Sequence, residues 1–204
     1  MDLRKAKQFW SWFEANNAKY LFLNEMTSDV KEQAIKTFQA ELHDYCQSVY
    51  FLIGNETEAR KKELIITAEG NKDYFSHVEF LIDNAPKLGR WELLKFKPPM
   101  GSGFKAVIQN REFDPRVTRC MLLEDTEQPG TIGLRMYYND FNLTYKRNFA
   151  YGTYVMLDML LGEKSATLDI DHLEIVKTPD NIEEMDFIYL DQIKKYIDIK
   201  KAGY

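Results

Sequence analysis

The sequence has little of several features that whole classes of proteins require. It contains two cysteines, Cys46 and Cys120, too few for a disulfide framework and in keeping with a reducing compartment. No apolar run approaches the ~18 residues of a membrane-spanning helix. The charged start MDLRKAKQFW also lacks the apolar stretch of a secretory signal. We therefore expect a cytoplasmic protein that does not enter a membrane.

The sequence also lacks an excess of basic residues and the composition typical of flexible segments. The formal net charge is −5, so the chain lacks the concentrated basic surface that binds phosphate backbones, and we do not expect a nucleic-acid partner. The short basic runs at 60–62, 194–195 and 200–201 are typical of solvated surface. With six prolines, ten glycines and no low-complexity tract in 204 residues, we expect no disordered linker.

Motifs for catalysis, cofactors and metals are missing. There is no Walker loop, dinucleotide fingerprint, nucleophile elbow, HExxH or calcium loop. The three histidines lie on separate predicted elements, and His43 with Cys46 offers two ligands where a zinc site needs more. We therefore predict no cofactor and no metal, and we favour a protein that is not an enzyme. Glu69 and Glu163 are the only acid–base candidates.

The pattern of secondary structure is clearest from Glu63 to Lys97. A strand rich in β-branched residues, 64–67, is followed by the turn Gly70-Asn71 and by apolar residues at helical spacing over 75–85. Ala85-Pro86 ends this helix, because the residue before proline is pushed out of the α region. A second strand over 91–96 completes a strand–helix–strand unit.

Two runs along the chain, residues 49–97 and 117–177, share the order strand, strand, helix, strand. Predicted helices over 2–18 and 29–48 precede the first run, and one over 189–199 follows the second. We therefore predict an α+β fold of two strand–strand–helix–strand, ferredoxin-like halves, with antiparallel sheets covered by helices. A single larger mixed sheet is the alternative.

Residues 1–98 form the expected N-terminal half and residues 104–204 the C-terminal half, packed together as one compact unit. Within the C-terminal half we expect a turn over 126–130 and a helix that ends at Gly162. The hydrophobic pattern shifts phase near Asp171, which predicts a bulge in the last strand.

Several segments together resemble an uncharacterised family of bacterial cytoplasmic proteins, a domain of unknown function. They are FWSWFEANNAKYLF near the N-terminus, ELIITAEGN, the helix over 75–85 with its Ala-Pro end, Trp91, FKPP at 96–99 and LLGE at 160–163. The resemblance covers most of the chain and implies a stand-alone bacterial protein. It implies no activity and no site residues.

Four aromatic residues lie within five positions of the first helix: Phe9, Trp10, Trp12 and Phe13. If exposed, they would form a surface for a protein partner or a second copy of the chain, since Trp and Phe are favoured at interfaces. Alternatively, the helix packs across the body of its own chain, because large exposed apolar patches are rare on monomers.

A ligand site is predicted where a strand gives way to a helix. Glu69-Gly70-Asn71 occupies such a position, where ligands can meet backbone amides. We predict that Glu69, Asn71 and Trp91 line a small-molecule site in a groove between the two halves. The alternative is a plain glycine turn. The acidic run 169–174 is split between two strand faces, which favours exposed surface over a metal site.

These observations favour a non-catalytic interaction or regulatory module that binds a protein partner or self-associates. A small-ligand binding protein, with its site between the two halves, is the alternative.

Overall fold

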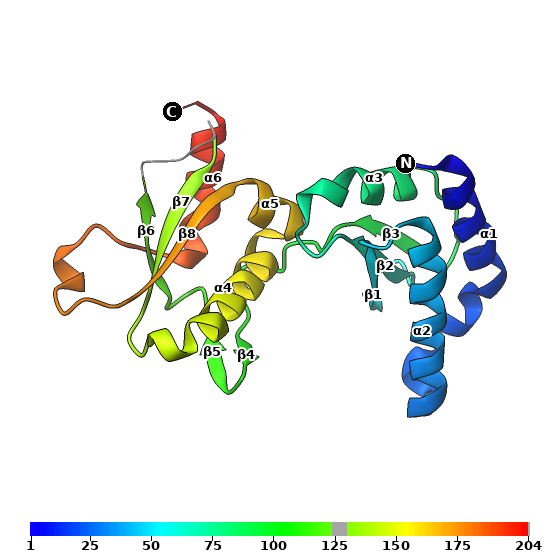
Figure 1. The fold of residues 1–204 in the computed structure, drawn as a ribbon, viewed down its shortest axis with the longest axis horizontal. Helices are drawn as coiled ribbons and strands as arrows, with labels where there is room; N and C mark the ends of the chain where they lie inside the picture. Colours follow the sequence, from blue (N-terminus) through cyan, green and yellow to red (C-terminus); the bar gives the residue numbers. More distant parts are fainter. Residues whose placement is uncertain (124–129, 204) are drawn as a thin grey trace. The chain divides into compact units, whose positions relative to one another are not determined.

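The structure is a computed structural model and describes residues 1–123 and 130–203 (Figure 1). The chain forms two compact units, Met1–Lys97 and Pro98–Tyr204. No described helix is both long enough and apolar enough to cross a membrane. Of the turn expected over residues 126–130, only Gly130 belongs to the described part of the chain.

Unit 1 places helices on a three-stranded sheet (Figure 1). Its helical segments are α1 (Leu3–Tyr20), the 3-10 turn η1 (Leu23–Glu25), α2 (Ser28–Tyr45), the 3-10 turn η2 (Lys72–Tyr74) and α3 (Phe75–Asp83). Its strands, in spatial order, are β1 (Tyr50–Glu56), β2 (Lys62–Thr67) and β3 (Trp91–Lys95). β1 pairs antiparallel with β2, and β2 pairs parallel with β3. The free edge of β1 is therefore one border of the sheet.

An aromatic-rich core holds the helices of unit 1 against one face of this sheet. Leu64 and Ile66 of β2 belong to the core, whereas Ile65 between them faces the opposite side by strand alternation. Phe38 of α2 stacks on Phe51 of β1, with ring centroids 3.8 Å apart. This contact places α2 alongside β1.

Unit 2, in its described residues, contains a four-stranded sheet in the order β8-β7-β6-β9 and a separate hairpin of β4 and β5. The strands are β4 (Ala106–Ile108), β5 (Arg111–Phe113), β6 (Arg119–Leu123), β7 (Ile132–Tyr138), β8 (Ile170–Lys177) and β9 (Ile188–Tyr189). The α-helices are α4 (Lys146–Leu161), α5 (Glu163–Leu168) and α6 (Ile193–Lys201). Three 3-10 turns accompany them: η3 (Leu143–Tyr145), η4 (Ile182–Glu184) and η5 (Leu190–Gln192).

The interior strand β7 organises the larger sheet of unit 2. It pairs antiparallel with β6 and parallel with β8, and every residue of β7 except Arg135 is buried. The β7–β8 register shifts between Ile132 and Gly133, which pair with Ile170 and His172 and leave Asp171 as the extra residue. The bulge predicted near Asp171 is therefore confirmed.

The predicted α+β class is confirmed in its coarse form, since both units combine helices with small sheets. The expectation of purely antiparallel sheets is wrong, because β2–β3 and β7–β8 are parallel pairs. In each case a helical connection carries the chain back to the end where the previous strand began, and the next strand then runs in the same direction. The ferredoxin-like arrangement is not confirmed, because these parallel strands are direct neighbours and not a split βαβ unit.

The hairpin β4–β5 packs directly on α4 because of a glycine. Gly152 lies on the buried side of α4, and a Cβ atom at this position would overlap the ring of Phe113 in β5. Phe113 is itself buried and meets Tyr138 of β7 edge-on, with centroids 5.7 Å apart. Because glycine has no side chain, the Phe113 ring has room to pack against α4 in the core of unit 2.

We expect the substitution Gly152→Ala to destabilise the protein by about 1–3 kcal/mol, because the Phe113 ring must move out of a filled core. In an ordinary helix interior the same change stabilises by up to about 1 kcal/mol. Urea unfolding followed by circular dichroism measures the difference. Gly103→Ala is the control, since a Cβ there meets nothing within 4 Å. A Gly152→Ala protein more stable than wild type would contradict this packing.

Candidate functional site

The aromatic residues predicted as a partner surface lie mainly inside unit 1. Phe9, Trp10 and Phe13 are buried in the core, and Trp12 is half-buried against it. The indole N–H of Trp10 donates to the carbonyl of Leu81 at 2.8 Å, which ties α1 to α3. This corrects the expected surface: the buried rings fill the space between the helices and the sheet, so they cannot meet a partner in this fold.

Trp91 does not join the other two residues predicted to bind a ligand. It is buried at the start of β3, and its indole N–H donates to the side-chain oxygen of Asn17 at 3.2 Å. Trp91 pairs with Lys62 at one end of β2, whereas Glu69 and Asn71 follow the other end of that strand. The three residues therefore do not form one site.

Glu69 and Asn71 shape the turn between β2 and α3. Asn71 caps η2, because its side-chain oxygen accepts the N–H of Asp73 at 3.2 Å. Glu69 and Gly70 have φ angles of 51° and 77°, a left-handed conformation that is uncommon for residues other than glycine. Lys97 Nζ donates to the Glu69 carboxylate at 3.2 Å. Of the three predicted ligand residues, Glu69 is the one that lines the groove of unit 1.

This groove has a volume of about 530 Å³ and follows the free edge of β1. Consecutive residues from Tyr50 to Asn55 line it. Because neighbouring residues of a strand point to opposite faces, a groove that touches all of them runs along the strand's edge. β2 occupies the other edge of β1, and no strand in the described chain pairs with the groove side.

The opposite wall of the groove comes from α2 and from the segment after α1. Lys31, Ile35 and Gln39 line the groove and, being four residues apart, share one side of α2. The centre of the groove is apolar and open to solvent, since Ile35 is 39% exposed and Leu52 of β1 is 42% exposed. Its two ends are polar.

Contacts between α2 and the start of β1 close one end of the groove. The side-chain amide of Gln39 donates to the carbonyl of Val49 at 3.0 Å, and the His43 ring meets Tyr50 edge-on at 5.6 Å between centroids. Lys31, two turns before Gln39, and Lys62, opposite the last residue of β1, line the groove toward the other end. Neither lysine forms an ion pair within the described residues. That end therefore carries two lysine side chains without a carboxylate partner in the described chain.

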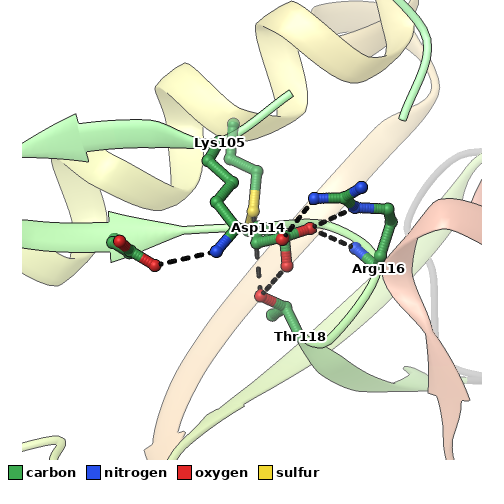
Figure 2. A network of polar contacts seen from close by, with 6 residues as sticks. Lys105, Asp114, Arg116 and Thr118 are labelled. Carbon is green, nitrogen blue, oxygen red and sulfur yellow. Dashed lines mark hydrogen bonds and ion pairs between the residues drawn. The ribbon is translucent and has the colours of Figure 1, made fainter. Parts of the chain in front are cut away.

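Unit 2 contains a second, more polar cleft of about 620 Å³. Figure 2 shows its central contacts, in which the Asp114 carboxylate accepts hydrogen bonds from Nε (2.9 Å), Nη2 (2.8 Å) and the backbone N–H (2.9 Å) of Arg116. Thr118 Oγ1 donates to the Asp114 carbonyl at 2.8 Å. Lys105, just before β4, donates to Glu112 at 3.2 Å. The two cations are therefore each matched by a carboxylate.

Asp114 and Arg116 form a fixed ion pair. The hydrogen bonds from the Arg116 side chain hold the pKa of Asp114 below its ordinary value of 3.8, and the same bonds raise the pKa of Arg116. The Asp114 side chain is only 6% exposed, so the carboxylate cannot turn to another partner without breaking this pair. A carboxylate held in this way stays ionised at neutral pH and is unsuited to proton transfer there.

Other groups that could carry chemistry are buried or occupied. Burial raises the pKa of the Cys120 thiol to about 12, so the thiolate does not form at neutral pH. Glu163 is fully buried, and the Asp169 carboxylate accepts a hydrogen bond from Lys201 at 2.8 Å. Within residues 1–123 and 130–203, no three His, Cys, Asp or Glu side chains come together as a metal site.

The groove residues Ile35, Tyr50 and Leu52 are not predicted from the sequence as site residues. Each has the pattern of a core residue: Ile35 belongs to the apolar stripe of a helix, and Tyr50 and Leu52 belong to an apolar strand. The sequence does contain one signal that this strand lies beside a site. The strand 50–53 is apolar at consecutive positions, whereas a strand with one solvated face alternates with polar residues.

Comparison with known proteins identifies no relative. No protein-family model matches the chain, and neither a curated protein nor a solved structure matches it. The resemblance to an uncharacterised bacterial family therefore stays a prediction.

The Asp114–Arg116 pair generates a prediction about pH. Because the folded-state pKa of Asp114 is lowered, its stabilisation is fully present above the ordinary pKa of 3.8 and is lost as the pH falls through the folded value. We expect Asp114→Asn to lower the free energy of unfolding by about 1 kcal/mol or more at neutral pH. The difference from wild type should shrink below pH 3.8.

Urea unfolding of both proteins across this pH range tests the expectation. The asparagine keeps the size of the side chain and can still accept the Arg116 backbone N–H, so the comparison isolates the charge. A difference that is the same at neutral and acidic pH would show that the carboxylate charge does not matter.

Proposed function

We propose that this chain is a non-catalytic interaction module of the bacterial cytoplasm and that the groove of unit 1 binds an extended segment of a partner protein. The segment adds a strand to the free edge of β1 and inserts alternate side chains into the groove, a known mode of peptide recognition. The observation that carries the proposal is the coincidence of an unpaired strand edge with an open apolar groove along its length.

The backbone of β1 supports binding by strand addition. An edge strand presents unpaired N–H and C=O groups, which serve as a template for another chain. β1 has seven residues, which corresponds to about 20 Å of extended chain. A partner segment of similar length can therefore pair along the whole edge.

The side chains around the groove define the chemistry of the partner. Ile35 and Leu52 offer apolar contacts at the centre. Lys31 and Lys62 line the groove toward one end, and neither has a carboxylate partner in the described chain. At the other end Glu69 is already bound to Lys97. We infer that the segment has apolar residues at alternate positions and an acidic residue at the end that meets the two lysines.

The titratable groups support a role without catalysis. Asp2, Asp114 and Glu174 are three described carboxylates with shifted pKa values, and each is shifted downward by hydrogen bonds to its charged form. A catalytic carboxylate that works as an acid at neutral pH needs the opposite shift. These three groups are therefore anions with structural partners.

Selection of a random twelve-residue peptide library on the purified chain, followed by fluorescence anisotropy of the selected peptides, tests this function. We expect peptides with alternating apolar residues and an acidic end. Ile35→Glu should weaken their binding about tenfold or more, because it places a charge at the apolar centre of the groove.

Val30→Glu is the matched control. Val30 is a 55% exposed residue of the same helix that does not line the groove, and its substitution changes the charge by the same amount. Binding should stay within about twofold of wild type for this variant, as expected for a residue outside the contact. Equal binding by wild type and Ile35→Glu, or no selected peptide at all, would overturn the proposal.

A further inference from the structure

A second exposed surface lies on unit 2, at the start of α4. Two tyrosines of this helix, Tyr151 and Tyr154, are each 61% exposed, and Leu143 in the preceding turn η3 is 78% exposed. Large apolar and aromatic side chains exposed together are unusual on a monomer and mark interaction sites. We call Leu143, Arg147, Tyr151 and Tyr154, together with the flanking Lys146, the tyrosine face.

The tyrosine face is one continuous side of the helix. Arg147, Tyr151 and Tyr154 are separated by four and three residues, so they lie above one another on α4. The opposite side of α4 carries buried residues of the unit 2 core, among them Phe149 and Met156. The exposed tyrosine rings are therefore not part of the core, because other residues of the helix already form its buried apolar side.

Charge distinguishes this face from an ordinary apolar patch. The first turn of α4 contains Lys146 and Arg147 and no acidic residue. Cations are disfavoured at a helix N-terminus by the helix dipole, so this placement costs stability. Neither cation forms an ion pair within the described part of the chain. On a protein with a formal net charge of −5, this is a local positive surface next to exposed rings.

We propose that the tyrosine face docks an acidic segment of a partner protein that also carries aromatic or aliphatic side chains. Lys146 and Arg147 pair with its carboxylates, and Tyr151 and Tyr154 cover its apolar groups. Tyrosine and arginine are the residues that most often dominate binding at such contacts. This surface belongs to unit 2, whereas the groove on β1 belongs to unit 1.

An acidic protein segment fits better than a nucleic acid. Nucleic-acid binding depends on neutralising many phosphates, typically with a basic stripe, and this face offers two cations. Two cations beside two phenol rings suit a short acidic and apolar peptide, where charge selects the partner and the rings supply contact area.

Binding of three polymers to the purified full chain tests the proposal. The probes are a glutamate–tyrosine copolymer, polyglutamate and single-stranded poly(U), each measured by biolayer interferometry at two salt concentrations. We expect the copolymer to bind about tenfold more tightly than polyglutamate, because only the copolymer engages the rings. Tyr151→Ser with Tyr154→Ser should remove this advantage, and Lys146→Glu with Arg147→Glu should weaken both acidic polymers.

Two control variants test whether binding depends on the tyrosine face itself and not on the overall charge or on the groove of unit 1. Lys194→Glu with Lys195→Glu makes the same charge change at exposed residues of α6 and should leave binding unchanged. Ile35→Glu in the groove should also leave it unchanged, so the two proposed surfaces succeed or fail independently. Circular dichroism confirms that each variant is folded. Equal affinity for the two acidic polymers, tighter binding of poly(U), or no binding would each overturn the proposal.

Discussion

The stacking of Phe38 on Phe51 is the contact on which the groove of unit 1 depends. The two rings are 3.8 Å apart between centroids, and Phe38 also meets Phe9 and Phe13 of α1 edge-on, at 5.7 and 5.5 Å. Ile35 lies one turn before Phe38 on α2, so the packing of one ring fixes the wall of the groove. The aromatic residues of α1 thus contribute to recognition indirectly: they are the support behind α2 rather than a surface of their own.

An edge strand is a hazard that proteins usually cover, shorten or protect with charge. In unit 1 the edge of β1 is partly covered by α2, and the cover leaves an open groove of about 530 Å³. Such a groove admits one extended chain more readily than a flat sheet edge, because α2 limits access from one side. The polar cleft of unit 2 is different, since its central charges are already satisfied by each other and need no ligand for neutrality.

Much of the fold follows from local sequence patterns. The unit from β2 to β3, the end of α4 before Gly162 and the bulge at Asp171 all agree with the structure, because each depends on residues close in the chain. Strand direction depends on which strands become neighbours, so the parallel pairs are not predictable in this way. The short helix α5 and the strand β5 are also missed: six and three residues are too few for a periodic pattern. The candidate site is harder still to predict from the sequence. Ile35, Tyr50 and Leu52 have the pattern of core residues, and only the structure shows that β1 has a free edge.

Hydrogen exchange of the backbone amides, with and without a selected peptide, tests the central claim most directly. Strand addition pairs the outward N–H groups of β1 with the peptide, so the account predicts slower exchange at alternate residues of β1 and little change in β3 or unit 2. Protection confined to α2, or spread over the chain without a change in β1, would contradict it, because the groove would then be occupied without a new strand or not occupied at all.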